Sequence, residues 1–263
     1  MIAWYLLICI WLGCALAMVA VWAYARRTHN IGYVDVAWAA LMGLMAIAVA
    51  IGGLGTILPR ALVGVLGAVW ALRLCLHLFH RVHRKPEDGR YARLRDHWQG
   101  HPAKLFLFFQ AQALIVALFA IPLLVAVSNP VTGVTGWIIA SVLLWVLSVG
   151  GETLADGQLS AWRSDPAHRG KTCRVGLWAW SRHPNYFFEW LHWFSYALIA
   201  VGAPHAWIAL AGPALMFAFL YRVTGIPYTE AQALRSRGDD YLDYQRDVSA
   251  FFPWPPRSPS LPH

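Results

Sequence analysis

The sequence is poor in charged residues. Asp, Glu, Lys and Arg make up 13% of its 263 residues, against about 25% in an ordinary globular protein, whereas hydrophobic residues make up 59%. So few charges cannot cover an aqueous surface, and we therefore expect an integral membrane protein and exclude a disordered chain or a coiled coil. The four cysteines lie in apolar stretches or in a basic loop, which argues against a disulfide framework.

Several familiar site motifs are absent as well. No G-x-G-x-x-G and no G-x-x-x-x-G-K-[ST] segment occurs, which excludes a Rossmann domain and a P-loop. Histidines recur at three- or four-residue spacing in HLFHRVH and DHWQGH, a spacing that allows shared metal ligands on a helix. The further histidine cluster that membrane di-iron enzymes need is missing, so we expect no metal site.

Long apolar runs dominate what is present, and they predict an all-α membrane protein. A span needs about 20 mostly apolar residues. Seven segments meet this need, near residues 3–25, 32–53, 57–79, 105–127, 134–155, 184–202 and 206–224.

The positive charges predict the orientation of these spans. With the spans above, every Lys and Arg except Arg60 and Arg73 falls on one side of the membrane. The positive-inside rule then predicts an outside N-terminus and a cytoplasmic C-terminus. The net charge of +8 belongs to these loops, and we expect contact with membrane lipids and none with nucleic acid.

A basic loop precedes a helix that we expect to begin near Pro184. The N-terminus of a helix offers free N–H groups to an anion, and arginine adds bidentate contacts to phosphate. A loop that touches anionic lipid headgroups is the alternative. Polar residues on the same helix favour a nucleotide site. The cations are Arg163, Arg169, Lys171, Arg174 and Arg182, and the helix residues are Asn185, Tyr186 and Glu189.

Carboxylates at membrane depth are the second group of candidates, because ionisable residues there are costly and usually functional. Asp35 lies at the start of the second predicted span. Glu152 and Asp156 are one helical turn apart near the inner end of the fifth. The alternative interpretation is that each is a capping or snorkelling residue near the interface.

Three segments of the C-terminal 110 residues resemble one family. The run R-H-P-N-Y from Arg182, followed by Glu189, resembles the signature of the steroid 5α-reductase superfamily, which also contains sterol reductases and isoprenylcysteine carboxyl methyltransferases. The segment E-x-x-x-D-x-x-L from Glu152 is similar to a reductase motif. Glu230 and the G-x-x-Y-x-x-Y run that contains Tyr241 resemble the closing motif of the superfamily.

The resemblance implies an NADPH-dependent reductase of a carbon–carbon double bond in a steroid, isoprenoid or acyl substrate that enters from the bilayer. The N-terminal half most resembles a bacterial group of the superfamily, which implies a location in a bacterial inner membrane. It implies a substrate-side half over residues 1–104, a cytoplasm-facing cofactor half over 105–257 and a loose tail over 258–263. The residues implied at the cofactor are Glu152, Asp156, Arg163, Arg169, Lys171, Arg182, His183, Asn185, Tyr186, Glu189, Glu230 and Tyr241.

A reductase of this kind also needs an acid at the carbonyl end of its substrate, and two residues qualify. A carboxyl group buried in a span, such as Asp35, would keep its proton because desolvation raises its pKa. Tyr91, between Arg90 and Arg93, is the other donor. The sequence leaves the choice between them open.

Two other functions remain open from the sequence. The R-H-P run and the closing motif also fit an S-adenosylmethionine-dependent methyltransferase of the isoprenylcysteine carboxyl methyltransferase type. Such a cofactor carries no phosphate, so the dense arginines favour NADPH. A lipid transporter is the third alternative, but the sequence has neither the internal repeats nor the interrupted central helices typical of one.

Overall fold

The computed structural model describes residues 2–83, 86–223 and 225–257, and everything it describes is helix, turn or loop. The predicted tail at 258–263 lies outside these residues. The chain divides into two compact units, which we describe separately. Unit 1 comprises residues 1–139 and 196–212, and unit 2 comprises residues 140–195 and 213–263.

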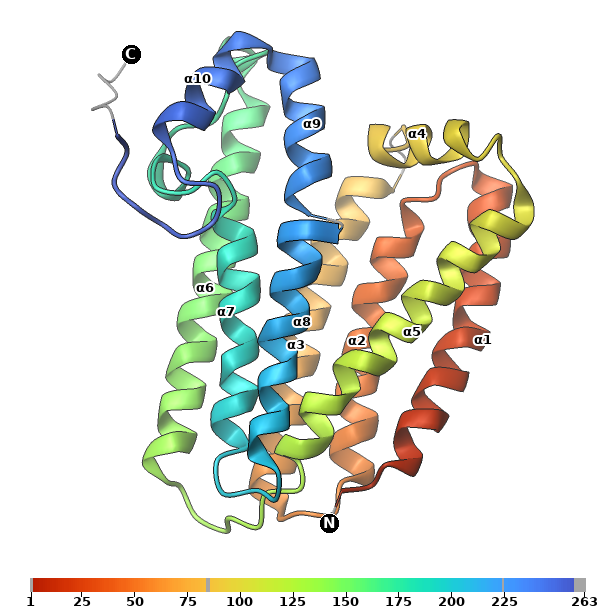
Figure 1. Cartoon of the computed structure of the whole chain (residues 1–263), viewed down its shortest axis with the longest axis vertical. Helices are drawn as coiled ribbons and strands as arrows, with labels where there is room; N and C mark the ends of the chain where they lie inside the picture. The colour runs from red at the N-terminus through yellow and green to blue at the C-terminus, as the bar shows by residue number, and fades with distance from the viewer. Residues whose placement is uncertain (1, 84–85, 224, 258–263) are drawn as a thin grey trace. The chain divides into compact units, whose positions relative to one another are not determined.

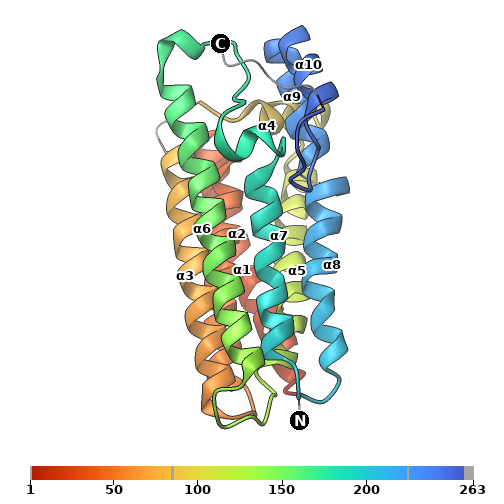
Figure 2. The ribbon, with the colours of Figure 1, turned by 90° about the vertical axis from the view of Figure 1, so that its left-hand side faces the viewer.

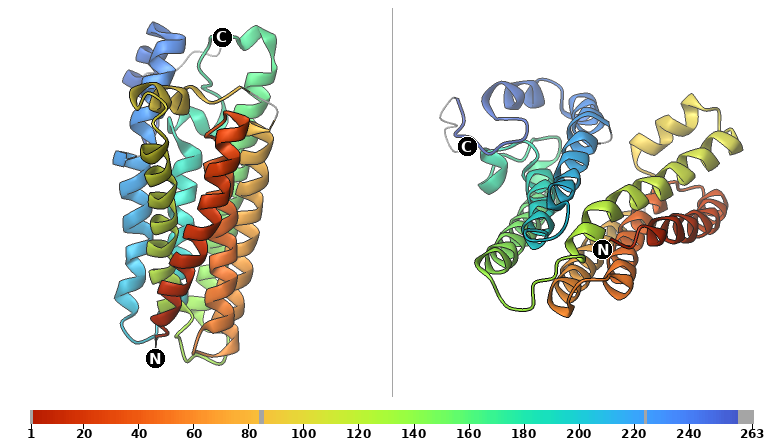
Figure 3. Two further views of the ribbon diagram at one scale, coloured as in Figure 1. Left: turned by 90° about the vertical axis from the view of Figure 1, so that its right-hand side faces the viewer. Right: turned by 60° about the horizontal axis from the view of Figure 1, so that its bottom comes forward.

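Unit 1 is built on four long helices, which Figure 1 shows side by side with the short α4 across one end. They are α1 (Tyr5–Thr28), α2 (Tyr33–Gly52), α3 (Ile57–Val82) and α5 (Pro102–Ala126), and α4 is Gly89–His97. Figure 3 shows α5 running obliquely over α1 and α2, and it packs against both. By its contacts, α5 groups with α1 and α2 in unit 1. The division at 104/105 into a substrate-side half and a cofactor half concerns function and stays a prediction.

Small residues bring α2 and α3 close together. A Cβ added to Gly67 would lie 2.5 Å from the Cβ of Ala46, and one added to Gly43 would lie 2.9 Å from that of Ala71. Contacts of this kind let two backbones approach, and in a bilayer such packing is a main source of helix association.

Asn129 fastens three connections at one end of unit 1. Its side-chain amide donates to the carbonyls of Ile199 at 2.6 Å and Val201 at 2.9 Å, and its side-chain oxygen accepts from the N–H of Val131 at 3.0 Å. Its own carbonyl accepts from the N–H of Thr56 at 3.2 Å. Through its side-chain amide and its backbone carbonyl, Asn129 thus holds the α2–α3, α5–α6 and α7–η3 connections together.

Arg60, the arginine that the predicted topology leaves on the side opposite the others, has a structural role here. Its guanidinium donates to the carbonyls of Ala50 at 2.8 Å and Ile51 at 2.6 Å, at the C-terminal end of α2. The last carbonyls of a helix have no partner within the helix, and a cation near them is favourable.

Unit 2 contains the rest of the helices. Figures 1 and 2 show α6, α7 and α8 side by side, with α9 and α10 at one end. A Cβ on Gly151 of α6 would lie 2.5 Å from the ring of Phe188 on α7, so these helices are in close contact. The helices are α6 (Gly136–Ser164), α7 (Pro184–Ile199), α8 (Ala211–Ala218), α9 (Ile226–Arg237) and α10 (Asp239–Asp247), and a π-helical turn, Phe219–Val223, follows α8.

The prediction of an all-helical membrane protein is confirmed. Within the described residues, six helices are long and apolar enough to cross a membrane. The segment predicted as a span at 184–202 forms α7, which has 16 residues and is shorter than those six. The count of seven spans and the orientation stay predictions. The six are Tyr5–Thr28, Tyr33–Gly52, Ile57–Val82, Pro102–Ala126, Gly136–Ser164 and Ala206–Arg237.

Candidate functional site

A cluster of charged groups in unit 1 surrounds a buried tyrosine. Tyr91 on α4 donates a short hydrogen bond from its phenol to Oδ1 of Asp35, in the first turn of α2. The other carboxylate oxygen of Asp35 lies 3.7 Å from a guanidinium nitrogen of Arg81 and 3.7 Å from one of Arg90. The two residues between which the sequence left the acid open therefore form one hydrogen-bonded pair.

The surroundings of this pair favour the tyrosine as the donor. Burial raises the pKa of Tyr91 well above its ordinary value, and the negative charge of Asp35 raises it further, so the phenol keeps its proton. The Asp35 side chain is 28% exposed and has two guanidinium groups beside it. It therefore does not lie in the apolar surroundings that the sequence-based argument for a protonated carboxyl assumed.

Hydrogen bonds of Asp88 and Glu87 hold α4 in position, and with it Tyr91. Asp88 caps the helix by accepting from the N–H of Arg90 at 2.9 Å, and the guanidinium of Arg90, at 3.2 Å, helps to hold the pKa of Asp88 below its usual range against the effect of burial. Glu87 accepts from the N–H of Ile31 at 2.7 Å and from Arg95 at 2.6 Å. These contacts attach α4 to the connection between α1 and α2.

Unit 2 contains a second cluster, centred on the carboxylate of Glu230 in α9. Its Oε1 accepts from Nε of Arg182 at 2.7 Å and lies 3.2 Å from Nε2 of His183, and its Oε2 accepts from the amide of Gln245 at 2.7 Å. The Arg182 and Glu230 side chains are 12% and 14% exposed. This pair is therefore largely desolvated, and removing one partner would leave a buried charge.

His183 is a neutral group in this cluster. Its side chain is 3% exposed, and burial lowers its pKa, although the hydrogen bond to Glu230 opposes the change. Its ring stacks on that of Tyr186 at 5.3 Å between centroids, and the phenol oxygen of Tyr186 lies 3.3 Å from the hydroxyl of Thr229. A cationic role for His183 at neutral pH is not supported by this geometry.

The loop before α7 folds onto the end of α10 through backbone groups. The guanidinium of Arg182 also donates to the carbonyls of Gln245 at 3.0 Å and Val248 at 2.7 Å. Tyr244 donates from its phenol to the carbonyl of Trp178 at 2.5 Å, and Ser181 donates to that of Phe251 at 2.9 Å. The arrangement joins the R-H-P run to the closing motif.

The remaining predicted cofactor residues fall into two groups. Asn185 donates to the carboxylate of Asp156 at 3.1 Å, so these two come together as the motifs imply. Tyr241 is buried, and burial together with the charge of Glu230 raises its pKa. Glu152 is buried on α6 and Glu189 is half-buried on α7, whereas three cations lie exposed on the surface of unit 2: Arg163, Arg169 and Lys171.

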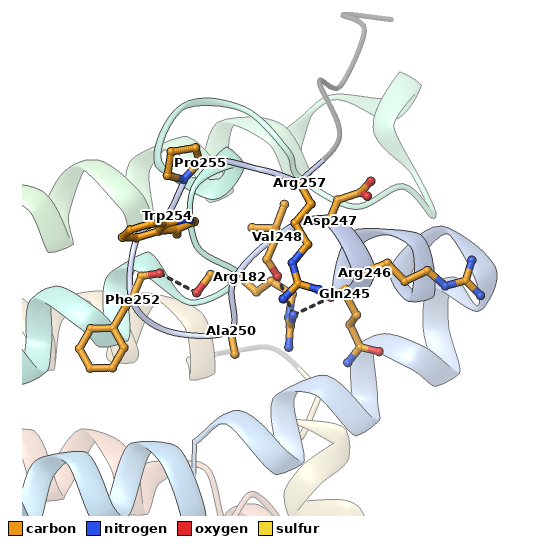
Figure 4. A pocket seen from close by; sticks show the side chains of 11 residues that line it. Arg182, Gln245, Arg246, Asp247, Val248, Ala250, Phe252, Trp254, Pro255 and Arg257 are labelled. Atoms are coloured by element: carbon orange, nitrogen blue, oxygen red, sulfur yellow. Dashed lines mark hydrogen bonds between the residues drawn. The ribbon is translucent and has the colours of Figure 1, made fainter.

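A pocket of about 400 Å³ lies beside Arg182, within the size range of small-molecule sites. Figure 4 shows the side chains of Arg182, Gln245 and Arg257 gathered near one another, with Phe252 and Trp254 toward the other end of the pocket. Of these residues, only Arg182 belongs to a candidate site predicted from the sequence. Isolated polar residues outside a motif do not indicate a binding site in the sequence. Only the folded structure shows that these residues line the same pocket.

Among the described residues, no three His, Cys, Asp or Glu side chains come together in a group that could hold a metal ion. Nδ1 of His80 lies 2.7 Å from the carbonyl of Leu76, and Nδ1 of His83 lies 3.5 Å from the phenol of Tyr33.

Comparison with known proteins finds a family model described as "Protein of unknown function (DUF1295)", which matches residues 21–248. The chain is also similar to "Uncharacterized protein C594.04c" of Schizosaccharomyces pombe. The two are 28% identical over 269 residues, covering 88% of this chain and 75% of the yeast protein. The family match includes both clusters described above.

Proposed function

This chain belongs to the DUF1295 family, and we propose that it is a reductase of the steroid 5α-reductase superfamily that uses NADPH to reduce a carbon–carbon double bond in a lipid-like substrate. The proposal places the enzyme in the inner membrane with its active site facing the cytoplasm. The observation that carries it is the hydrogen bond from Tyr91 to Asp35.

A proton donor of this kind distinguishes reduction from methyl transfer. Reduction of a double bond conjugated to a carbonyl adds a hydride to one carbon, and a donor must stabilise or protonate the oxygen as negative charge develops. Methyl transfer to a carboxylate needs no such acid. Burial keeps the Tyr91 phenol protonated at neutral pH, and its hydrogen bond to Asp35 holds the phenol oxygen in place. To act as the donor, this O–H would turn from Asp35 to the carbonyl oxygen of the substrate.

The polar residues of unit 2 suit a phosphate-bearing cofactor by their chemistry. The amide and carboxylate pair of Asn185 and Asp156 offers both donors and acceptors, as a nicotinamide or ribose group requires. The exposed cations Arg163, Arg169 and Lys171 remain accessible for phosphate groups. When bound, NADPH would supply the hydride. The carboxylate of Glu230 holds Arg182 and His183, the two residues just before α7 that the proposal assigns to the cofactor phosphates.

Cofactor binding by detergent-purified, full-length protein tests the proposal. A ligand that binds only the folded state raises its stability by about 2.7 kcal/mol at a hundredfold excess over the dissociation constant. We expect NADPH to raise the melting temperature and S-adenosylmethionine to leave it unchanged. We expect Asn185→Ala and Arg163→Ala to weaken NADPH binding by about 1–3 kcal/mol each, and Arg27→Ala, an exposed arginine of α1, to serve as the charge-matched control.

Stabilisation by S-adenosylmethionine alone would assign the protein to the methyltransferase branch. NADPH affinity that is equal in Asn185→Ala, Arg163→Ala and the wild type would show that the cofactor does not bind at these residues, even if it binds elsewhere.

A further inference from the structure

Large aromatic side chains are exposed on the segment that follows α10. Within residues 249–257, Phe252 is 52% exposed and Trp254 is 70% exposed, and neighbouring Trp180 is 49% exposed. Aromatic surface of this kind is costly in water and marks an interaction site. Tryptophan in particular is enriched where a membrane protein meets the headgroup layer.

Specific contacts hold this segment against the helices of unit 2. The ring of Phe251 is buried and packs 5.9 Å from that of Phe187 on α7 and 5.3 Å from that of Phe217 on α8. The N–H of Trp254 donates to the carbonyl of Trp180 at 2.9 Å. The exposed ring of Phe252 lies 6.3 Å from that of Phe217. Since α8 belongs to an apolar stretch that can cross the bilayer, this ring lies beside a candidate membrane span.

The pocket beside these rings carries more positive than negative charge. Arg182, Arg246 and Arg257 line it together with the carboxylate of Asp247. That carboxylate also faces Arg174, at 3.9 Å. Two of the lining cations have carboxylate partners outside the lining: Arg182 lies 2.7 Å from Glu230, and Arg246 lies 3.0 Å from Asp243. The positive excess therefore rests on Arg257. The N–H of Arg257 donates to the carbonyl of Asp247 at 2.9 Å, which fixes the point from which its exposed side chain leaves the backbone.

We propose that this pocket binds the phosphate headgroup of an anionic phospholipid, with Phe252 and Trp254 at the boundary of the acyl chains. The combination of guanidinium groups with exposed rings matches a molecule that has a phosphate at one end and an apolar part beside it. Inorganic phosphate would pair with the arginines and leave both rings in water, whereas the acyl chains of a lipid would cover them. The segment therefore anchors unit 2 to the membrane surface, whether or not the protein is a reductase.

The test uses full-length protein in a neutral detergent, with phosphatidylglycerol or phosphatidylcholine added. We expect phosphatidylglycerol to raise the melting temperature of the wild type more than phosphatidylcholine does. Each arginine near an anionic lipid surface strengthens binding about fivefold. Arg257→Ala should therefore weaken the apparent affinity for phosphatidylglycerol by about fivefold, and Arg257→Lys should retain most of it. Arg235→Ala, at an exposed arginine of α9 outside the pocket, is the matched control.

Three results would overturn the proposal. The first is equal phosphatidylglycerol affinity in Arg257→Ala and the wild type, and the second is equal loss in Arg257→Ala and Arg235→Ala. The third is a stabilisation by inorganic phosphate or NADPH that Arg257→Ala removes while the phosphatidylglycerol effect persists, which would assign the pocket to a soluble ligand. Failure of NADPH binding at Asn185 would leave the lipid result unaffected, so the two proposals are tested independently.

Discussion

The phenol of Tyr91 donates its hydrogen bond to the carboxylate of Asp35, and the two residues are 56 positions apart in the chain. Two neighbouring residues position α4 for this contact. Asp88 caps the first turn of α4, and Glu87 accepts from the N–H of Ile31, just before α2. Each contact is local or made by a single side chain. Together they hold a protonated donor at the end of an apolar helix.

Replacing Tyr91 by Phe removes this donor and keeps the ring. If Tyr91 acts on the substrate, we expect turnover to fall by about 10²–10⁴-fold, the usual contribution of a positioned acid, with NADPH affinity unchanged. Oxidation of NADPH in the presence of unsaturated lipid substrates measures the rate, and the thermal shift measures the affinity. Tyr24→Phe, at an exposed tyrosine of α1, is the control. Full activity in Tyr91→Phe would remove this residue from the mechanism.

His183 makes stability depend on pH in a predictable direction. Its pKa is lowered in the folded state because burial disfavours the charged ring. Below the unfolded-state pKa of about 6.5, the unfolded chain therefore binds a proton that the folded chain does not. We expect stability to fall as pH drops below this value, by at most about 1.4 kcal/mol per pH unit from this group.

The comparison variant for this prediction is His183→Asn, measured by thermal unfolding between pH 7.5 and 5. Its melting temperature should decline less with falling pH than that of the wild type. Parallel declines would show that the titration of other groups accounts for the whole effect.

Glu230→Gln should be strongly destabilising. The substitution leaves the charge of Arg182 in a largely desolvated place without its carboxylate, and breaking a buried pair in this way costs about 3–5 kcal/mol. Chemical or thermal unfolding in detergent measures the loss. The double variant Arg182→Met with Glu230→Gln should recover part of it, and a double variant no more stable than Glu230→Gln would contradict a charge-based explanation.

Gly67→Ala should disturb the contact between α2 and α3. The new methyl group would meet Ala46 at 2.5 Å, and overpacking of this kind costs about 1–3 kcal/mol. Adding Ala46→Gly should restore most of the stability. Gly13→Ala on α1 is the control, because a Cβ there meets nothing within 4 Å. A neutral or stabilising Gly67→Ala would mean that the helices can separate without cost.

The sequence predicted that the chain is helical and embedded in a membrane. The mean hydropathy of a segment depends only on its own residues and not on how its neighbours pack. The sequence did not predict the contact between α2 and α3. Gly43, Ala46 and Gly67 lie within helices that are apolar throughout, and only the partner helix shows which small residues face it.

The candidate site was predictable residue by residue but not as pairs. The motifs named Arg182, His183 and Glu230, and the structure brings these three together. The hydrogen bond from Gln245 to the carboxylate of Glu230 could not be predicted from the sequence. An isolated polar residue has no spacing that indicates its partner. The predicted roles of the exposed cations Arg163, Arg169 and Lys171 concern contacts with a bound cofactor, and the NADPH-binding measurement on Arg163→Ala tests the first of them.

Unit 1 is formed by two chain segments that are far apart in the sequence, and this affects the order in which it can fold during synthesis. Asn129 completes its hydrogen bonds only with the carbonyls of Ile199 and Val201, which are synthesised about seventy residues later. Insertion of the first four long helices therefore leaves a polar amide whose acceptors do not yet exist. During translation, unit 1 is therefore completed only after residues 140–195, the first of the two segments of unit 2, have been synthesised. A chain truncated after residue 139 would contain the helices of unit 1 and lack the segment that closes it.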